Sequence, residues 1–352
     1  MRLVSVNKLR LDSKIAVDIY DNYGQIILYK NTNVTQPIIH KLDYMNIEYI
    51  YITDEYCLSN PESLFMAQLD NMGEVISKLE ELGKASFEGT ATEEIVMEAY
   101  FTVEDIVEEL FKKKEYLKIR YIPDKMTGNT TAGTIIYMSI MTAIFGIKAG
   151  LAKEEVENLF MASLLKDVGI ISPYLKNLQN AYQLHPALAY NYLSKKYFLH
   201  SDVLVGILHH HEMIDGTGFP QKLQGHSIHK FAKIIQLMEM FFELKLSHKI
   251  LGNMNTQLKP KLSELFKKYD VHFLEILLDN TEFFSLDTMV ELSNGDIGVV
   301  VKNRECDVFF PAIQIIKTKS EKFLLNEVID LEKFSDIEIE RIIYYLDNES
   351  SL

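Results

Sequence analysis

Alternating apolar and polar residues mark the first part of the chain. The stretches KIAVDIYD, QIILYKNT and IEYIYITD have the two-residue period of β-strands. Between the last two, TQPIIHKLDYM has the three- and four-residue spacing of a helix. Residues 1–60 are therefore predicted to form a small α+β domain.

Helical spacing of apolar residues begins after this segment. Asn60 followed by Pro61 is typical of a helix start, because proline is favoured at the first helical position. The helical pattern then continues, with breaks at glycines and prolines, as far as residue 284. We expect a helical connector over residues 61–128 and a helical core over residues 129–284.

The remaining residues predict a second small β unit. TMVELSNGDIGVVVKN is typical of a β-hairpin with an Asn-Gly turn, and PAIQIIKT of a further strand. SDIEIERIIYYL has a capping box from Ser335 to Glu338 and then the pattern of a short amphipathic helix. We expect a small β module over 285–330 and a C-terminal helix over 331–352, so that the fold class is mainly α with a helical core between two smaller units.

Composition narrows the classes of partner. A chain of 352 residues exceeds what one hydrophobic core usually serves, and its formal net charge of -14 offers no basic field for DNA or an anionic membrane. The apolar run over 133–147 is too short to span a bilayer and ends at Lys148. Cys57 and Cys306 lie far apart and predict neither a disulfide framework nor a metal knuckle. We expect no DNA binding, no membrane span and a cytoplasmic location.

Histidines are concentrated in one part of the predicted core. Five of the ten fall within 27 residues, with Asp167 just upstream: His185, His200, His209, His210 and His211. Neutral imidazole and carboxylate groups are common ligands of transition metals. Consecutive helical residues point about 100° apart, so adjacent histidines can share a site only at a helix end, which the turn at Asp215 supplies. The pattern leaves two alternatives open, a metal site and a set of surface or capping histidines.

Three motifs in this region resemble a known family. HHEMIDGTGFP resembles the HHExxDGxGYP signature of the HD-GYP family, FMASLLKDVGI is similar to its LLHDIGK helix, and LHPALAYNYL to its HPexGxxiL segment, in the same order. The resemblance covers residues 129 to about 250. It implies a helical core of the HD superfamily and descent from metal-dependent phosphodiesterases that hydrolyse the bacterial second messenger cyclic di-GMP.

The resemblance also implies a set of metal ligands, which is incomplete here. It assigns four ligands that are present: Asp167, His185, His210 and His211. Lys166 stands in place of the histidine of the HD pair and Thr134 in place of an earlier helix histidine, while Glu239 falls on a further acidic ligand. Because the missing ligands belong to one metal, we expect a single divalent transition metal ion, Fe, Mn, Zn or Ni.

Lys166 has two alternative interpretations. Its ammonium either lies near the lost metal position, paired with Asp167 or Glu239, or points to solvent beside a pocket that holds no metal. Asp167 and Lys166 are the candidate catalytic residues. The position of Lys166 is degenerate, because a lysine replaces the family's histidine there.

Positions that the resemblance assigns to substrate binding are also altered. The family's phosphate-binding lysine is replaced by Ile170, and only His248 and Lys249 remain as candidate contacts in the segment HKIL. Fewer cationic donors weaken both the binding of a phosphodiester and the stabilisation of its transition state.

The signature turn itself is retained. It comprises Asp215, Gly216, Gly218, Phe219 and Pro220. Phe219 keeps the aromatic body of the family's tyrosine and lacks its hydroxyl. We expect Asp215 and Glu212 to hold the turn and not to bind metal, since an Asp before Gly has a sufficient structural role.

Three functions remain open. The first is a degenerate HD-GYP-like protein that binds one metal ion and a cyclic dinucleotide or a protein partner, with weak or absent hydrolysis. The second is an active phosphodiesterase that cleaves cyclic di-GMP to pGpG or GMP. The third is a non-catalytic scaffold that docks protein partners through its first domain or through the predicted SDIEIERIIYYL helix.

Overall fold

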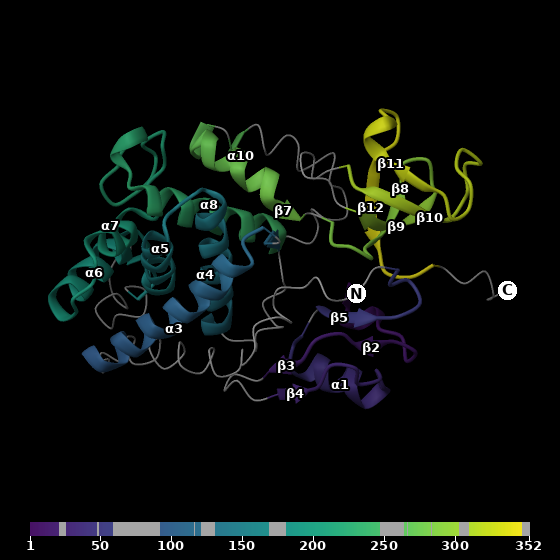
Figure 1. Ribbon diagram of the computed structural model, residues 1–352, viewed down its shortest axis with the longest axis horizontal. Helices are drawn as coiled ribbons and strands as arrows, with labels where there is room; N and C mark the ends of the chain where they lie inside the picture. Colours follow the sequence, from purple (N-terminus) through teal and green to yellow (C-terminus); the bar gives the residue numbers. More distant parts are fainter. Residues whose placement is uncertain are drawn as a thin grey trace.

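Helices gather at one end of the protein and strands from both ends of the sequence at the other (Figure 1). The computed structural model describes residues 1–20, 26–47, 49–58, 92–115, 117–120, 131–168, 181–246, 264–265, 267–282, 284–302 and 310–346. A helical body lies between a small α+β domain and a small sheet module in the sequence. The predicted fold class, mainly α with two small β-containing units, is confirmed.

The first domain is built on a three-stranded antiparallel sheet. Its strands follow the order β1 (Arg2–Ser5), β5 (Tyr49–Thr53) and β2 (Lys14–Ile15). A short 3-10 helix η1 (Val6–Lys8), the hairpin of β3 (Ile19–Tyr20) and β4 (Ile26–Leu28), and helix α1 (Gln36–Tyr44) complete it. Val4, Ile15, Leu42 and Ile50 are fully buried in its core. Side chains from the strands and from α1 thus share the core of this small α+β domain.

Seven helices make up the described part of the helical body. They are α3 (Glu93–Lys112), α4 (Thr131–Lys148), α5 (Lys153–Leu165), α6 (Ala181–Lys196), α7 (Ser201–His209), α8 (Lys230–Leu246) and α10 (Val271–Asn280). A 3-10 helix, η6 (Gly225–Ser227), precedes α8. The parallel pair of β6 (Ile119–Arg120) and β7 (Thr281–Glu282) joins the segment between α3 and α4 to the end of α10. Of the helices in these ranges, none combines the length and apolar character that crossing a membrane requires.

Helix α3 lies within the segment expected to be a connector. Its buried residues recur at three- and four-residue spacing, among them Val96, Val103 and Val107, and they join the same hydrophobic core as α4 and α5. The helix therefore packs on the helical body. Residues 61–91, 116 and 121–128 of the expected connector lie outside the described residues.

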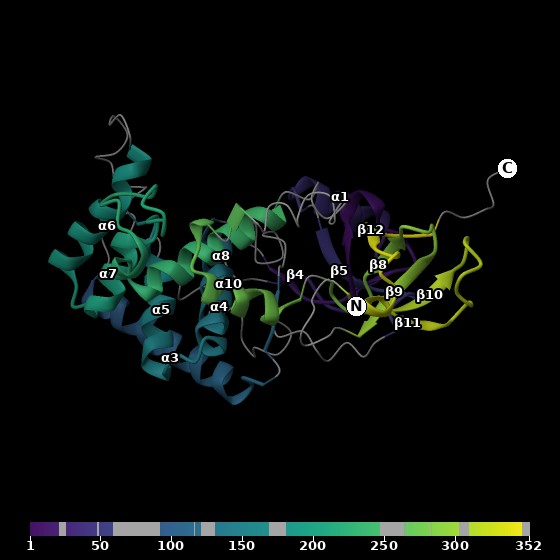
Figure 2. The same ribbon diagram turned by 90° about the horizontal axis from the view of Figure 1, so that it is seen from above.

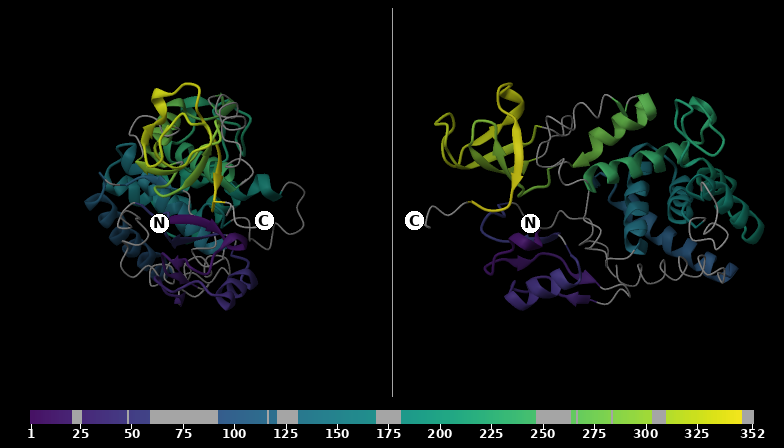
Figure 3. Two further views of the ribbon diagram at one scale, coloured as in Figure 1. Left: turned by 90° about the vertical axis from the view of Figure 1, so that its right-hand side faces the viewer. Right: turned by 180° about the vertical axis from the view of Figure 1, so that it is seen from behind.

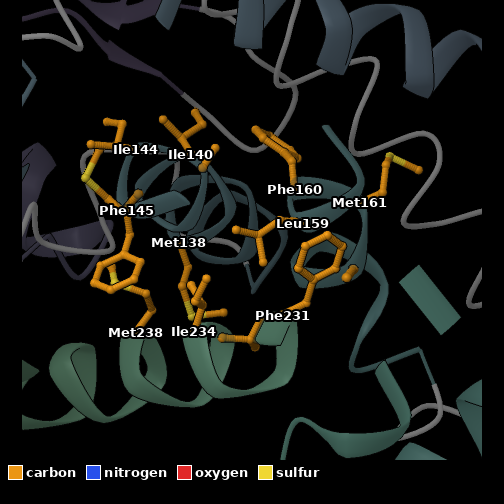
Figure 4. Packing of buried hydrophobic residues seen from close by; sticks show 14 of the residues in the cluster. Met138, Ile140, Ile144, Phe145, Leu159, Phe160, Met161, Phe231, Ile234 and Met238 are labelled. Carbon is orange, nitrogen blue, oxygen red and sulfur yellow. The ribbon is translucent and has the colours of Figure 1, made fainter. Parts of the chain in front are cut away.

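The core of the helical body forms where α4, α5 and α8 meet. Figure 4 shows Phe145 of α4 next to Met238 of α8, and Leu159 of α5 close to Phe231 of α8. All four side chains are fully buried. Because α4 is apolar on nearly every face, helices can cover it on several sides.

Close packing at Gly206 fixes the position of α7. An added Cβ at Gly206 would lie 3.1 Å from Phe231 Cβ and 3.4 Å from Ala162 Cβ, so a larger residue would push α7 away from α8 and α5. The end of α7, where His210 and His211 follow, is thereby held against both helices.

A five-stranded antiparallel sheet forms the C-terminal module. Its order is β11 (Val328–Asp330), β10 (Ala312–Lys317), β9 (Ile297–Lys302), β8 (Met289–Leu292) and β12 (Ile339–Ile343), with a 3-10 helix η7 (Leu331–Lys333) after β11. The predicted hairpin corresponds to β8 and β9. Gly295 adopts a φ of 84° in its turn, a conformation that favours glycine.

The predicted C-terminal helix over 331–352 is wrong. Residues Ile339–Ile343 form strand β12, which pairs with β8 at the edge of the sheet. Ile337 and Ile339 are both buried, a two-residue spacing that also fits a strand, and Arg341 pairs with Glu291 on β8. Pairing with the open edge of β8 outweighs the helical pattern of this segment. The C-terminal β module therefore extends beyond residue 330, where it was expected to end.

Arg2 joins the first domain to residues that follow β12. Its guanidinium, 1% exposed, binds Asp54 at 2.5 Å and donates a hydrogen bond to the carbonyl of Tyr344. The Arg10 guanidinium lies 4.0 Å from the ring centroid of Tyr345. The two sheets consequently lie together, at the end of the molecule opposite α6 and α7 (Figures 2 and 3).

Candidate metal centre

Four helices bring the candidate ligands together. Asp167 follows the end of α5, His185 lies in the second turn of α6, His210 and His211 follow α7, and Glu239 lies on α8. Helix α7 contacts α5, α6 and α8. The adjacent histidines can share one site because they stand just past a helix end, as expected from the turn at Asp215.

His185 and His210 face each other across the centre. Both are fully buried, and their Nε2 atoms lie 3.1 Å apart. Nδ1 of His185 lies 2.5 Å from the carbonyl oxygen of Tyr182, and Nδ1 of His210 lies 2.6 Å from that of Ile207. Since a carbonyl oxygen only accepts hydrogen bonds, both rings carry a proton on Nδ1 and, when neutral, an unshared electron pair on Nε2.

Asp167 and His211 extend this pair. Oδ1 of Asp167 lies 3.5 Å from His185 Nε2 and 3.8 Å from His210 Nε2. Nitrogen atoms of His185, His210 and His211 lie within 4.8 Å of one another, as do ligand atoms of Asp167, His210 and Glu239. Imidazole nitrogens together with a carboxylate match the preferences of late first-row metals, so the donor set fits the expected ion.

The three histidines are neutral at physiological pH. Burial lowers the pKa of His185, and it lowers that of His210 well below its ordinary value. For His211, burial and then the charge of Lys166 lower the pKa to about 4. Neutral imidazoles are the form that binds metal ions, so these rings need not lose a proton first.

Lys166 lies among the acidic side chains of the same centre. Its side chain is 4% exposed, and its ammonium contacts Asp167 and lies 2.5 Å from Glu239 Oε1. Burial opposes the charge, but Glu239 and then Asp167 raise the pKa of Lys166 above its ordinary value. The expected ion pair is therefore present with both carboxylates, and the alternative of a solvent-facing Lys166 is excluded.

The signature turn is held by buried hydrogen bonds. Glu212, 1% exposed, accepts backbone hydrogen bonds from Gln221 at 2.6 Å and from Leu223 at 2.8 Å. Gly218 leaves no room for a side chain, because an added Cβ would lie 2.3 Å from the backbone nitrogen of Met213. Glu212 thus serves the turn, as expected.

The rest of the turn supports His211. The Phe219 N–H donates to the carbonyl of His211 at 3.1 Å, and the two rings lie 4.7 Å apart between centroids. Gly216 has a φ of 80°, and Asp215 accepts hydrogen bonds from the backbone and hydroxyl of Thr217. Phe219 retains the expected packing role, directly before Pro220.

Some candidate residues are not brought into the centre. Nδ1 of His209 accepts a hydrogen bond from the backbone of His229 at 3.4 Å, so its ring serves the contact between α7 and the start of α8. His248, Lys249 and Ile170 lie outside the described residues, as does the side chain of Thr134.

Tyr182 is a neighbour of the centre that sequence reasoning missed. Its ring centroid lies 5.2 Å from that of His185 and 5.3 Å from that of His211. The sequence carried one signal for it, because Tyr182 precedes His185 by three residues in a helix and so lies one turn away on the same face.

Comparisons with known proteins place a known domain over the part of the chain that contains this centre. A family model described as "HD domain" matches residues 119–258. The cyclic di-GMP phosphodiesterase response regulator RpfG of Xanthomonas campestris is 33% identical over 124 residues, which cover 31% of this chain and 32% of that protein. The cyclic di-GMP phosphodiesterase PdeB of Borreliella burgdorferi is 24% identical over 224 residues, which cover 60% of this chain and 59% of that protein. The chain thus matches about a third and about three fifths of the length of these two curated relatives.

Among solved structures, Bd1817, described as a HDG"Y"P protein from Bdellovibrio bacteriovorus, aligns with a TM-score of 0.45 at 16% identity, over 78% of this chain and 97% of that one. The matched HD domain contains all of the described ligand positions and the signature turn. Residues 119–258 of the chain are thus an HD domain of the HD-GYP type.

Proposed function

We propose that this protein binds a cyclic dinucleotide, cyclic di-GMP or a close relative, at a centre with one divalent transition metal ion, and that it hydrolyses the ligand weakly or not at all. The observation that carries the proposal is Lys166, whose buried ammonium contacts both Asp167 and Glu239. Names of the two curated relatives supply the ligand class.

The histidine half of the centre supports one metal ion. Two Nε2 electron pairs that face each other at 3.1 Å repel unless a proton or a cation lies nearby, and burial disfavours the proton. His185, His210, His211 and Asp167 would hold the ion. A bound ion of this kind polarises phosphate oxygens and acidifies a water molecule.

The acidic half of the centre argues against a second ion. Asp167 and Glu239 would supply its carboxylate oxygens, but both already contact the Lys166 ammonium. A divalent cation in the same place would meet a like charge in a buried setting, where Coulomb repulsion is only weakly screened. The ammonium offsets the repulsion between the two carboxylates and thereby takes over part of the electrostatic role of an ion.

Loss of one ion predicts loss of catalytic power. Two-metal centres stabilise both the attacking and the leaving oxygen of a phosphoryl displacement, and a single ion cannot do both. Lys166 remains as a fixed positive charge, but its contacts with Asp167 and Glu239 direct it toward the protein. The chain's own residues therefore favour binding over turnover.

The scaffold alternative loses one of its two docking elements. The segment SDIEIERIIYYL contains strand β12, so it does not present the amphipathic helix expected for a partner. Docking through the first domain, and the cytoplasmic location, stay predictions.

The test is incubation of anaerobically purified protein with cyclic di-GMP and Mn²⁺ or Fe²⁺, with chromatography for pGpG and GMP and a parallel binding isotherm. The proposal expects saturable binding that is lost in His210→Ala, with little or no product. Rapid multiple turnover that His210→Ala abolishes would support the active phosphodiesterase instead. Absence of any binding to the wild-type protein would contradict the proposal.

A further inference from the structure

Tyr182 contacts two of the three histidines of the metal centre. Its backbone carbonyl accepts the Nδ1 proton of His185 at 2.5 Å, and its hydroxyl oxygen lies 3.4 Å from Nε2 of His211. Its ring also meets Phe219 edge-on at 5.8 Å. One residue in the first turn of α6 thus reaches both sides of the centre.

The side chain of Tyr182 is nevertheless open to solvent. The residue is 59% exposed, although its ring lies against His185 and His211. A large apolar ring gains little by remaining exposed, and its hydroxyl contact with His211 is longer than the roughly 2.8 Å of a well-formed hydroxyl hydrogen bond. The phenol is therefore close to the centre without being firmly held by it.

The phenol is also a suitable donor for an anion. A tyrosine hydroxyl keeps its proton at neutral pH and can donate one hydrogen bond. The ammonium of Lys166 is less suitable, because it is already paired with the carboxylates of Asp167 and Glu239. Among the described side chains that touch the three histidines, Tyr182 is thus the one that offers an exposed hydroxyl.

We propose that Tyr182 is a substrate-contacting residue of this centre, whose phenol donates a hydrogen bond to an oxygen of the bound phosphate group. The inference rests on the proposed function for the identity of the phosphate ligand, a cyclic dinucleotide. A small turn of the ring about its side-chain bonds exchanges the long contact with His211 for a shorter one with the ligand.

The test compares Tyr182→Phe with Tyr190→Phe. The first removes the hydroxyl and keeps the ring that packs on the histidines, and the second makes the same change two turns further along α6, at a residue outside the contacts of the centre. Metal-loaded proteins are titrated with inorganic phosphate and with cyclic di-GMP, and the metal content of each protein is measured.

We expect Tyr182→Phe to weaken the binding of both probes about 10-fold, the usual effect of losing one hydrogen bond to a charged group, with unchanged metal content. Tyr190→Phe should bind like the wild type. Equal binding by Tyr182→Phe and wild type, failure of the wild type to bind phosphate, or a loss of metal that parallels the loss of binding would each overturn the inference. If phosphate binding depends on Tyr182 but cyclic di-GMP does not bind, the inference stands and the proposed ligand is wrong.

Discussion

The ammonium nitrogen of Lys166 lies 2.5 Å from Oε1 of Glu239, and the same ammonium contacts Asp167. A positive side chain thus joins two acidic groups that come from the end of α5 and from α8. The relationship explains how a centre with fewer histidines can remain folded: the carboxylates keep a cation between them, and that cation is covalently part of the chain.

Replacing Lys166 by methionine should therefore destabilise the protein. The change keeps most of the side-chain volume but leaves Asp167 and Glu239 close together without a cation, and breaking a buried ion pair costs about 3 kcal/mol or more. Urea unfolding measures the difference in free energy. Lys230→Met is the matched control, because its partner Glu155 is partly exposed and such pairs contribute about 1 kcal/mol or less. Equal effects of the two substitutions would contradict this role of Lys166.

Lys166→His should change the number of bound metal ions. The substitution removes the positive charge. It also offers an imidazole nitrogen next to the potential metal ligands Asp167, His210 and Glu239. We expect the metal content to rise above that of the wild type when the variant is loaded with Mn²⁺ or Fe²⁺. An unchanged metal content would mean that the ammonium does not keep out a second ion.

Glu212→Gln should loosen the signature turn. Both carboxylate oxygens of Glu212 accept backbone hydrogen bonds in a buried position, and an amide group can accept only one of them while its NH₂ faces the other donor. The expected cost is about 1 to 3 kcal/mol of stability, measured by urea unfolding. Glu275→Gln, at an exposed position of α10, should stay within about 0.5 kcal/mol of the wild type. A similarly small effect at Glu212 would argue that its hydrogen bonds do not support the turn.

Asp296 should make the stability of the β module depend on pH. Burial raises the pKa of its carboxyl group, but hydrogen bonds from Lys319, Ser320 and Asn294 outweigh burial and hold the pKa below its ordinary value. A depressed pKa in the folded state stabilises the fold above the unfolded pKa of about 3.9, and this stabilisation is lost as the pH falls through the folded value.

Asp296→Asn removes this contribution. The stability difference between wild type and variant should be largest above about pH 5 and should narrow below about pH 4. Thermal unfolding of both proteins between pH 3 and pH 7 gives the difference. A gap that stays constant over this range would show that the ionised form of Asp296 is not favoured by folding.

The sequence predicted the parts of the fold that depend on local pattern. The alternating strands of the first domain, the Asn-Gly hairpin of β8 and β9, and the helical core all appear in the structure. The segment that contains strand β12 predicts a helix from sequence. The spacing of Ile337, Ile339 and Arg341 among its other charged residues fits the helical period as well as the strand period. Only the presence of an unpaired edge on β8, formed by residues some fifty positions earlier, decides between them.

The candidate site was predictable to a similar extent. The end of α7 explains how His210 and His211 share a centre. The ion pair of Lys166 was one of two alternatives that the family resemblance left open, and only the structure decides between them. The contribution of Tyr182 was missed, since aromatic residues at helical spacing usually belong to a core and this one is exposed. Its contact with His211 depends on how α6 packs beside α7, which no local pattern records.

The central claim is that this centre holds one metal ion because Lys166 takes the place of another. The most direct measurement is elemental analysis of anaerobically purified protein after loading with Mn²⁺ or Fe²⁺ and removal of free metal, with His210→Ala alongside. We predict one tightly bound ion per chain in the wild type and none in His210→Ala. Two or more ions per wild-type chain, or a metal content that His210→Ala leaves unchanged, would contradict the account.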